Sequence, residues 1–394
     1  MLKKILHVIA QYPDKTGSGV FLRALVNEGE KKGYTQAVIG ATSKDMEVVS
    51  FSKEVKFFPV EFNSDKLNFN IVGMSDIMPY PSTKYSDLTN SMFRDWKEIF
   101  ENTLERAINE FKPDIILSHH IWILTSIVAK MKSKAKLIVF SQGTELRQIE
   151  LASKYKDEVL SECGNIDLIC ALNDYQKNKI AKVFRINKSK IESFGVGYNN
   201  KVFYKPYENT EKKDFIYVGK ICKSKGVECL IKAFNSMNTD SKLYIVGSGA
   251  DQEFARDLGK YNSKIIFTGH LSQNDLASLM RKCKTFILPS FYEGLPLVIM
   301  EALACRCKVI VSDIEGIRPW VGDIINNSNG VSYIPMPRVN VDVPFEDDKK
   351  QFILDIKSLM ESSEIENINF NTIEYEIEKR SWEGYFTRLE KKFI

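Results

Sequence analysis

The feature of this sequence that most restricts its fold is a repeated alternation of short β-branched apolar runs with helix-length amphipathic stretches. This alternation is typical of a parallel β-sheet that is covered by helices on both faces. The series passes once through the first half of the chain and begins again in the second half. We therefore predict an α/β fold with two successive Rossmann-like, doubly wound domains. The strand candidates are Ile5–Ala10, Gln36–Ala41, Asp114–His119, Lys136–Gly143 and Asp167–Leu172, and then Asp214–Lys220, Lys242–Gly249, Lys264–His270, Thr285–Ser290 and Lys308–Asp313.

Chain length agrees with two domains, because 394 residues exceed one ordinary hydrophobic core. The segment 195–214 is rich in Asn, Lys, Gly and Pro and has no periodicity, so we place the linker there and divide the chain into residues 1–200 and 201–377. The long irregular segment Asn68–Leu88 is either a lid or binding loop or a packed structural loop.

Composition narrows the class of protein further. No apolar run is long enough for a membrane span, and the apolar stretch near the N-terminus is too short for a signal peptide. Seven cysteines without a framework spacing predict reduced thiols and a cytoplasmic protein. Cys305 and Cys307 have no second pair or histidines beside them, so we predict no metal.

Charge is unevenly distributed along the chain. Up to Lys205 there are 30 Lys and Arg against 24 Asp and Glu. A mildly basic first half is compatible with peripheral contact at the anionic inner membrane face or with an anionic acceptor, and equally with an ordinary solvated surface. We predict no nucleic-acid partner.

Two groups of residues at the ends of predicted strands could bind an anion. Open parallel sheets bind ligands at the carboxyl ends of their strands, so we expect an active cleft between two facing domains. Gly17 and Gly19 could present backbone N–H groups at a helix start, although a flexible connection explains them as well. Lys220 and Lys225 could hold a diphosphate, and their alternative reading is a solvated loop.

A pair of carboxylates, Glu293 and Glu301, is the most informative motif. Glu301 lies inside the apolar run Leu297–Ala304, and a buried carboxylate without a partner is costly. We therefore expect a ligand or a cation to meet it.

Three stretches of the second half resemble the donor domain of the retaining family-four glycosyltransferases, which have the GT-B architecture. They are Tyr217–Phe234, Leu243–Asp251 and Ile265–Asp313. The hallmark is a Glu-x7-Glu arrangement within an EG-P-x4-EA frame. This chain matches the frame at Glu293, Gly294, Pro296, Glu301 and Ala302. Weaker likeness extends over nearly the whole chain except Asn68–Leu88.

The resemblance implies a role for each residue of the motif. Glu301 would accept hydrogen bonds from the ribose hydroxyls of a nucleotide-sugar, and Glu293 would contact the hydroxyls of the donor sugar. Lys220, where most relatives have Arg, and Lys225 would hold the diphosphate. The remaining donor contacts would come from Gly247, His270 and Leu271 near the base, and from the N–H groups of Gly294, Leu295 and Leu297 near the sugar and phosphates.

In the first domain the resemblance points to a histidine. His119 and His120 follow the strand that begins at Asp114, and we favour His119 as the catalytic residue beside the anomeric carbon. Gly143, Thr144 and Glu145 lie at the next strand end, with Gln142 where relatives often have a histidine. The C-terminal residues 378–394 resemble a helix that crosses back to the first domain, which would close over donor and acceptor.

Together these features predict a metal-independent, retaining glycosyltransferase without a cofactor, which uses a nucleotide-sugar, with UDP as the first choice. Its acceptor could be a glycan, a lipid-linked saccharide, a peptide or a small metabolite, within polysaccharide, glycolipid or glycoconjugate biosynthesis. Two alternatives remain open. One is a sugar-nucleotide epimerase of similar architecture, and the other is a catalytically silent partner protein built on a transferase fold.

Overall fold

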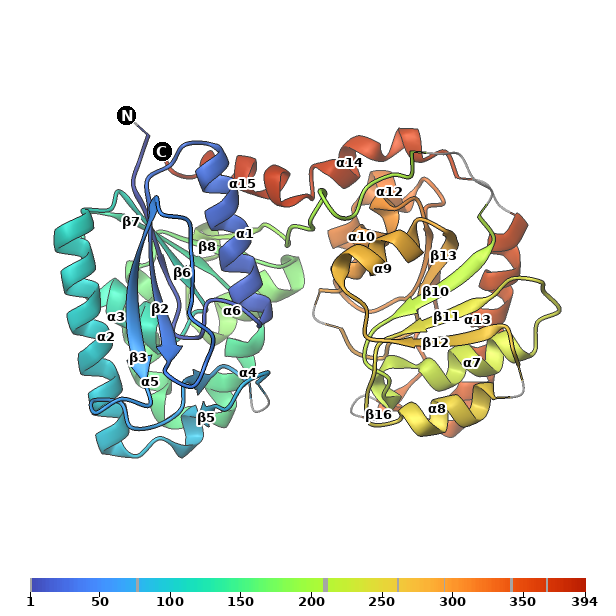
Figure 1. Ribbon diagram of the computed structural model, residues 1–394, viewed down its shortest axis with the longest axis horizontal. Coiled ribbons are helices and arrows are strands. Elements are labelled where there is room, and N and C mark those ends of the chain that lie inside the picture. Colours follow the sequence, from blue (N-terminus) through green and yellow to red (C-terminus); the bar gives the residue numbers. More distant parts are fainter. Residues whose placement is uncertain are drawn as a thin grey trace. The chain divides into compact units, whose positions relative to one another are not determined.

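The computed structural model describes residues 2–75, 78–207, 212–260, 262–293, 295–340, 343–365 and 368–394. The chain forms two compact units, and each is described by itself (Figure 1). Unit 1 comprises Met1–Gly195 together with Tyr385–Ile394, and unit 2 comprises Val196–Gly384. Each unit has its own hydrophobic core on the two faces of one sheet.

Unit 1 is built on a seven-stranded sheet in which every pair is parallel. The strand order is β3-β2-β1-β6-β7-β8-β9. The chain therefore starts at β1, moves outward to β3, and then returns to the other side of β1. The strands are β1 (Ile5–Val8), β2 (Gln36–Ser43), β3 (Val55–Phe62), β6 (Ile115–His119), β7 (Lys136–Phe140), β8 (Leu168–Ala171) and β9 (Ile191–Ser193).

Helices cover both faces of this sheet (Figure 1). The longest is α2, whose first turn is capped by the Thr89 hydroxyl. Its apolar side chains, among them Trp96 and Phe100, are fully buried. The helices are α1 (Gly17–Lys31), α2 (Asn90–Phe111), α3 (Ile123–Lys130), α4 (Thr144–Leu151), α5 (Lys156–Glu162) and α6 (Asp174–Val183), with 3₁₀ turns η1 (Tyr85–Asp87), η2 (Ser153–Tyr155), η3 (Cys163–Asn165) and η4 (Lys188–Lys190).

The irregular segment Asn68–Leu88 packs into the core of unit 1. It contains the short parallel pair β4 (Val72–Gly73) and β5 (Thr83–Lys84), and Tyr85 is enclosed by rings that include Trp96 and Trp122. This burial matches the packed-loop alternative for the described part of the segment, which omits residues 76 and 77.

Unit 2 repeats the same winding on a six-stranded sheet of order β12-β11-β10-β13-β14-β15, with parallel pairs throughout. Its strands are β10 (Asp214–Val218), β11 (Leu243–Val246), β12 (Ile265–Gly269), β13 (Cys283–Leu288), β14 (Lys308–Ser312) and β15 (Val331–Ile334), with the small hairpin β16 (Val339–Asn340) and β17 (Val343–Pro344).

The helices of unit 2 are mostly short. They are η5 (Lys223–Lys225), α7 (Val227–Asn235), α8 (Gln252–Gly259), α9 (Gln273–Met280), α10 (Val298–Ala304), α11 (Ile317–Val321), α12 (Asp323–Asn326), α13 (Glu346–Ile365), η6 (Phe370–Thr372) and α14 (Glu374–Glu378), followed by α15 (Trp382–Glu390). The chain passes from unit 2 into unit 1 within α15, since Tyr385–Ile394 pack with unit 1. This confirms the predicted return of the C-terminal helix to the first domain.

All ten predicted strands overlap observed ones, so the two-sheet prediction is confirmed. Among the described strands of the two large sheets, three were missed, β3, β9 and β15, and each lies at the edge of its sheet. In β3, exposed Lys56, Pro59 and Glu61 interrupt the apolar pattern. Proline is tolerated at a sheet edge, where its missing N–H faces no partner strand.

Candidate active site

Two loops of unit 2 bring the predicted phosphate and sugar residues together. In each sheet the chain reverses its winding direction beside the first strand, and ligands bind at such switch points. In unit 2 this point lies between β10 and β13. The loop after β10 carries Lys225, and the loop after β13 carries Glu293. The Nζ atom of Lys225 lies 2.8 Å from Oε1 of Glu293 and 3.0 Å from the carbonyl oxygen of Tyr292.

The two loops are fastened to one another through their backbones. The N–H of Phe291 donates to the carbonyl of Ser224 at 2.8 Å. Gly226 adopts φ +65°, and a Cβ at this position would overlap the carbonyl oxygen of Pro289. Only glycine permits both the left-handed conformation and the close approach. The ion pair between Lys225 and Glu293 is thus positioned by main-chain contacts.

A third loop, which follows β11, is hydrogen-bonded to the loop after β10. The N–H of Gly219 donates to Val246, and the N–H of Ile221 donates to Ser248, each at 3.0 Å. Gly247 has φ +127°, and a Cβ there would overlap the carbonyl oxygen of Gly219. The structure thus requires a glycine at 247 for loop packing, independently of any nucleotide.

Two residues that position the loop after β10 were not identified from the sequence. The Tyr217 hydroxyl donates to the carbonyl of Lys220 at 2.7 Å, and Asp251 accepts from the N–H of Lys223 at 2.7 Å. Burial, with Glu293 nearby, raises the pKa of Tyr217 well above its usual value, which keeps the hydroxyl a donor. The signal for Tyr217 was a polar group at the end of an apolar strand, where a buried hydroxyl requires a partner.

Glu301 lies in the first turn of α10, between buried residues on both sides. Among the described residues, no side chain or N–H donates a hydrogen bond to its carboxylate and no cation pairs with it. Burial alone raises the pKa of Glu301 to about 7. The carboxylate predicted to need an external partner therefore has none within the described part of unit 2.

The other residues predicted for the donor site lie after β10, β12 and β13 of unit 2. Leu295 and Leu297 lie partly exposed before α10, and their N–H groups donate to no other described residue. Gly294 lies outside the described residues. After β12, His270 is exposed and Leu271 packs partly on the core. Lys220 is exposed, and its ammonium group has no partner among the described residues.

In unit 1 the two adjacent histidines occupy different environments. His119 ends β6 within an aromatic cluster, at 5.3 Å from the Phe140 ring and 5.7 Å from the Phe21 ring. Both of its ring nitrogens are buried without a hydrogen-bond partner. Burial, with smaller contributions from neighbouring His7 and His120, holds the pKa of His119 well below its usual value, so the ring is neutral.

His120 has the left-handed φ of +73° and contacts a buried carboxylate. Its Nδ1 lies 3.3 Å from Oε2 of Glu145, which also accepts from the N–H of Gln142 at 2.9 Å. Burial acts to raise the pKa of Glu145, but its contact with His120 and a backbone hydrogen bond outweigh burial, so the net pKa is lowered. The sequence reasoning gave Glu145 no definite role, whereas the structure makes it the partner of His120.

The two glycines after β1 differ in their exposure and in their hydrogen bonding. Gly17 is exposed at the first residue of α1. Gly19 is buried, and its N–H donates to the hydroxyl of the capping residue Thr16 at 3.0 Å. The N–H of Gly19 is therefore already used within the helix cap.

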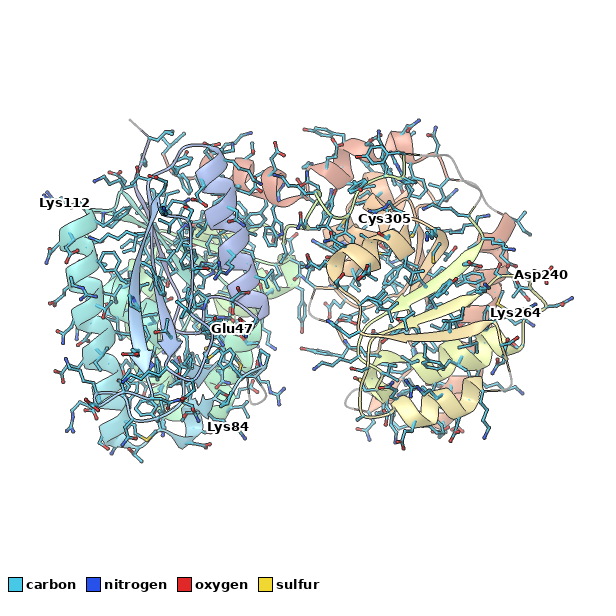
Figure 2. The ribbon with its side chains drawn as sticks, viewed as in Figure 1. Glu47, Lys84, Lys112, Asp240, Lys264 and Cys305 are labelled. Atoms are coloured by element: carbon cyan, nitrogen blue, oxygen red, sulfur yellow. The ribbon has the colours of Figure 1, made fainter. Side chains whose placement is uncertain are left out.

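The cysteines are all free, and six of them, including Cys305 and Cys307, have pKa values that burial raises (Figure 2 labels Cys305). Their described neighbours include no group of three or more His, Cys, Asp or Glu side chains arranged to hold a metal ion. In the same described ranges, no helix has the length and apolarity needed to cross a membrane.

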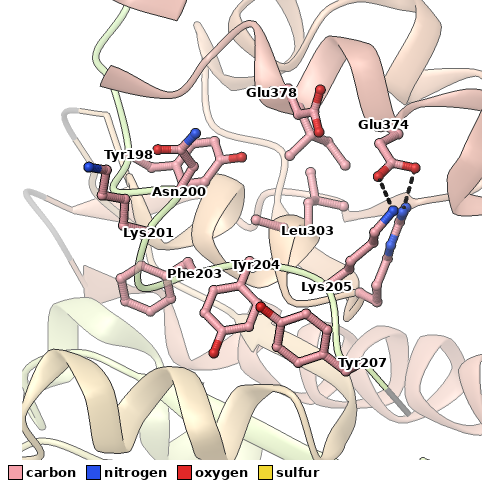
Figure 3. A pocket seen from close by; sticks show the side chains of 13 residues that line it. Tyr198, Asn200, Lys201, Phe203, Tyr204, Lys205, Tyr207, Leu303, Glu374 and Glu378 are labelled. Carbon is pink, nitrogen blue, oxygen red and sulfur yellow. Dashed lines mark hydrogen bonds and ion pairs between the residues drawn. The ribbon is translucent and has the colours of Figure 1, made fainter. Parts of the chain in front are cut away.

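A cavity of about 570 Å³ in unit 2 lies beside the linker, α14 and the end of α10 (Figure 3). Glu374 bridges two cations there, Lys205 at 2.8 Å and Arg306 at 2.9 Å. None of the residues predicted for the donor site lines this cavity.

Comparison with known proteins supports the class of site. Residues 200–335 match the family model "Glycosyl transferases group 1". Two relatives come from Campylobacter jejuni. One is an N-acetylgalactosamine-N,N'-diacetylbacillosaminyl-diphospho-undecaprenol 4-alpha-N-acetylgalactosaminyltransferase, which is 30% identical over 62% of this chain and 65% of that protein. The other is an N,N'-diacetylbacillosaminyl-diphospho-undecaprenol alpha-1,3-N-acetylgalactosaminyltransferase, which is 27% identical over 31% of this chain and 35% of that protein. This chain covers between 26% and 65% of the length of the curated relatives it matches.

Solved structures agree over nearly the full length. Sucrose-phosphate synthase from Thermosynechococcus elongatus has a TM-score of 0.65 at 14% identity, covering 100% of this chain and 98% of that one. Anabaena Alr3699/HepE in complex with UDP and glucose has a TM-score of 0.62 at 12% identity, with 99% of each chain covered. WaaG, a glycosyltransferase involved in lipopolysaccharide biosynthesis, has a TM-score of 0.63 at 12% identity, again with 99% of each covered. These likenesses show that the fold is GT-B.

Proposed function

We propose that this protein is a retaining glycosyltransferase of family four that moves a sugar from a nucleotide-sugar to an acceptor hydroxyl, and that unit 2 binds the donor. The observation that carries the proposal is Glu301, a carboxylate among apolar neighbours with a pKa of about 7 and no partner in the described structure. Two ribose hydroxyls would supply charge-assisted hydrogen bonds to it. The match of residues 200–335 to the glycosyltransferase family model supports this role.

The diphosphate is assigned to Lys220 and Lys225. An ammonium group has three donors, and in Lys225 two of them point to Glu293 and the Tyr292 carbonyl, which leaves one for a phosphate oxygen. Lys220 is exposed and has no described partner, so it is free to move onto the ligand. Both cations would stabilise the charge that develops on the leaving nucleoside diphosphate, without a metal ion.

The donor sugar is assigned to Glu293 and to the N–H groups of Gly294, Leu295 and Leu297. The ion pair with Lys225 holds the Glu293 carboxylate in place, so that it can accept hydrogen bonds from sugar hydroxyls. The base is assigned to the loops that carry Gly247, His270 and Leu271. UDP is the nucleotide we favour, and the UDP complex of Alr3699/HepE among proteins of the same fold supports that choice.

The acceptor is assigned to residues 1–200 with the returning helix 378–394, and the donor to residues 201–377. A lipid-linked saccharide is the acceptor class that we favour, because both Campylobacter relatives are named for diphospho-undecaprenol substrates. We keep His119 as the residue that supports the anomeric carbon and Gly17 as a donor contact, and we withdraw Gly19 because its N–H donates to Thr16. His120, with its Glu145 partner, is the alternative to His119, and a comparison of His119→Ala with His120→Ala separates them.

A thermal-shift panel of UDP-, GDP- and ADP-sugars tests the donor, and Glu301→Ala is expected to abolish the shift. Incubation with the responding donor and a lipid-linked saccharide, with and without EDTA, then tests transfer and its metal independence. Release of an altered nucleotide-sugar without acceptor would show an epimerase. Binding of a donor without turnover on any acceptor would show a catalytically silent protein.

A further inference from the structure

An open pocket of about 610 Å³ in unit 1 contains none of the individual residues to which a role was given above. It is formed by the end of α4, the start of α5 and one face of α6 (labelled in Figure 1). Four cations line it, namely Lys156, Lys179, Lys182 and Arg185. We call it the α6 pocket.

Helix periodicity explains why the cations gather here. Tyr175, Lys179 and Lys182 stand at positions i, i+4 and i+7 of α6, so they share one face. A different face of α6 carries Gln176 and Ile180, which are buried. Burial of that face therefore forces the cationic face toward solvent and into the pocket.

These cations are not neutralised by the protein. The charged group of none of the four makes a hydrogen bond or ion pair with another described residue. Other lysines of unit 1 do have partners, for example Lys97, which pairs with Glu158. Glu150 is the single carboxylate among the lining residues, so the pocket keeps an excess of three positive charges. Lys179 and Lys182 lie one turn apart on α6, so their charges repel, and a multivalent anion would relieve the repulsion.

The pocket also offers apolar surface. Ile149 is buried and Val183 is partly buried, and the Tyr175 ring, 49% exposed, stands beside the lysines. A simple inorganic anion would leave this surface unused. A phosphate ester with an apolar substituent would use both parts, because the ammonium and guanidinium groups would bind phosphate oxygens while the aliphatic and aromatic groups would contact the substituent.

We propose that the α6 pocket binds the diphosphate of an amphiphilic ester, and that this ester is the lipid-linked acceptor. The choice of acceptor rests on the function proposed above, whereas the diphosphate site rests on the pocket alone. The diphosphate would position the acceptor without taking part in the chemistry, so the four cations are positioning residues.

The test uses the full chain and geranyl diphosphate as a soluble probe, with saturating UDP present so that the cations of unit 2 are occupied. Calorimetry compares wild type with Lys179→Gln/Lys182→Gln. The matched control is Lys53→Gln/Lys66→Gln, which removes the same charge from exposed, unpaired positions of unit 1. We expect the pocket variant to bind at least tenfold more weakly, the control to be unchanged, and Glu150→Gln to bind more tightly.

Further measurements distinguish an amphiphilic diphosphate from an inorganic anion and from a membrane surface. Inorganic diphosphate is expected to bind more weakly than geranyl diphosphate, and equal binding would overturn the apolar part of the proposal. Adsorption to phosphatidylglycerol vesicles that is lost in the pocket variant, with no binding of geranyl diphosphate, would assign the pocket to a membrane surface and overturn it. Equal loss in the control variant would also overturn it.

Failure of the site and failure of the function give different results. If UDP does not bind but geranyl diphosphate binding still depends on Lys179 and Lys182, the transferase proposal fails and the α6 pocket stands. If transfer occurs and the KM for a lipid-diphosphate acceptor is the same in the pocket variant, the site fails. The expected result is a KM raised at least tenfold with kcat unchanged.

Discussion

Replacement of Glu301 by Gln should change the stability and the ligand affinity of this protein in opposite directions. The glutamine keeps the shape of the side chain but carries no charge. In the native protein Glu301 stands between buried apolar residues in the sequence of α10, and desolvation raises its pKa to about 7. Ionisation of Glu301 therefore destabilises the folded state when no ligand is bound.

The magnitude follows from the shift in pKa. The folded protein holds the Glu301 proton more tightly than the unfolded chain, whose value is 4.5. The stability that protonated Glu301 contributes to the folded state is therefore fully present below pH 4.5 and is lost as the pH rises to about 7. At about 1.4 kcal/mol per pH unit, the loss is about 3 kcal/mol. Because Glu301→Gln does not titrate, its stability relative to wild type should increase by up to this amount between pH 4.5 and pH 8.

Affinity for the nucleotide should fall in the same variant. A hydrogen bond to a charged acceptor contributes about 1.5 to 3 kcal/mol, so the loss of the carboxylate should weaken UDP binding roughly tenfold to a hundredfold. In wild type, UDP should bind the ionised form. Its affinity should then increase from pH 6 to pH 8, with proton release that calorimetry in buffers of different ionisation enthalpy can measure.

The assay must report on unit 2, since a two-unit chain need not unfold in one step. Hydrogen exchange of the amides in α10 and β14 at pH 5 and pH 8 gives a local free energy of opening. Glu253→Gln, on the exposed face of α8, is the matched control, and because it retains Glu301 it should show the same pH dependence as wild type. The reasoning is refuted if Glu301→Gln opens more easily than wild type at pH 8, or if it binds UDP with wild-type affinity.

Three further variants test the loops around Glu301. Lys225→Gln should weaken UDP binding about tenfold, and it should also reduce turnover because Glu293 loses its 2.8 Å partner; equal affinity in a calorimetric titration would contradict the phosphate role. Gly226→Ala should lower the free energy of unfolding by about 2 kcal/mol or more through steric overlap and a left-handed φ, which thermal unfolding measures. Tyr217→Phe should cost about 1 kcal/mol in stability and raise the KM for the donor, and an unchanged KM would show that the hydroxyl does not position the loop.

The sequence predicted interior strands well and edge strands poorly. An interior strand of a parallel sheet is buried on both faces, so it appears as a continuous apolar run such as that of β14. An edge strand is partly exposed, and β3 alternates buried residues with Lys56, Pro59 and Glu61. Such a pattern does not stand out from a polar loop. The parallel pairing of β3 with β2 supplies the evidence that composition lacked.

Within the candidate site, the sequence identified residue types and the fold decided their neighbours. The spacing of Glu293 and Glu301 and their apolar surroundings are local features, so both residues could be selected without coordinates. The histidine pair shows the limit. His119 and His120 are adjacent in sequence, but the strand ends between them, and one ring enters an aromatic cluster while the other meets Glu145.

The sequence by itself determined that two doubly wound parallel sheets follow one another and that a carboxylate stands among apolar residues late in the chain, because periodicity and the cost of a buried charge are local properties. Only the tertiary structure decided that Lys225 meets Glu293 across 68 positions, and that four cations without partners gather around α6. The crossover connections of a parallel sheet bring distant strand ends together, and no local pattern encodes which side chains then meet.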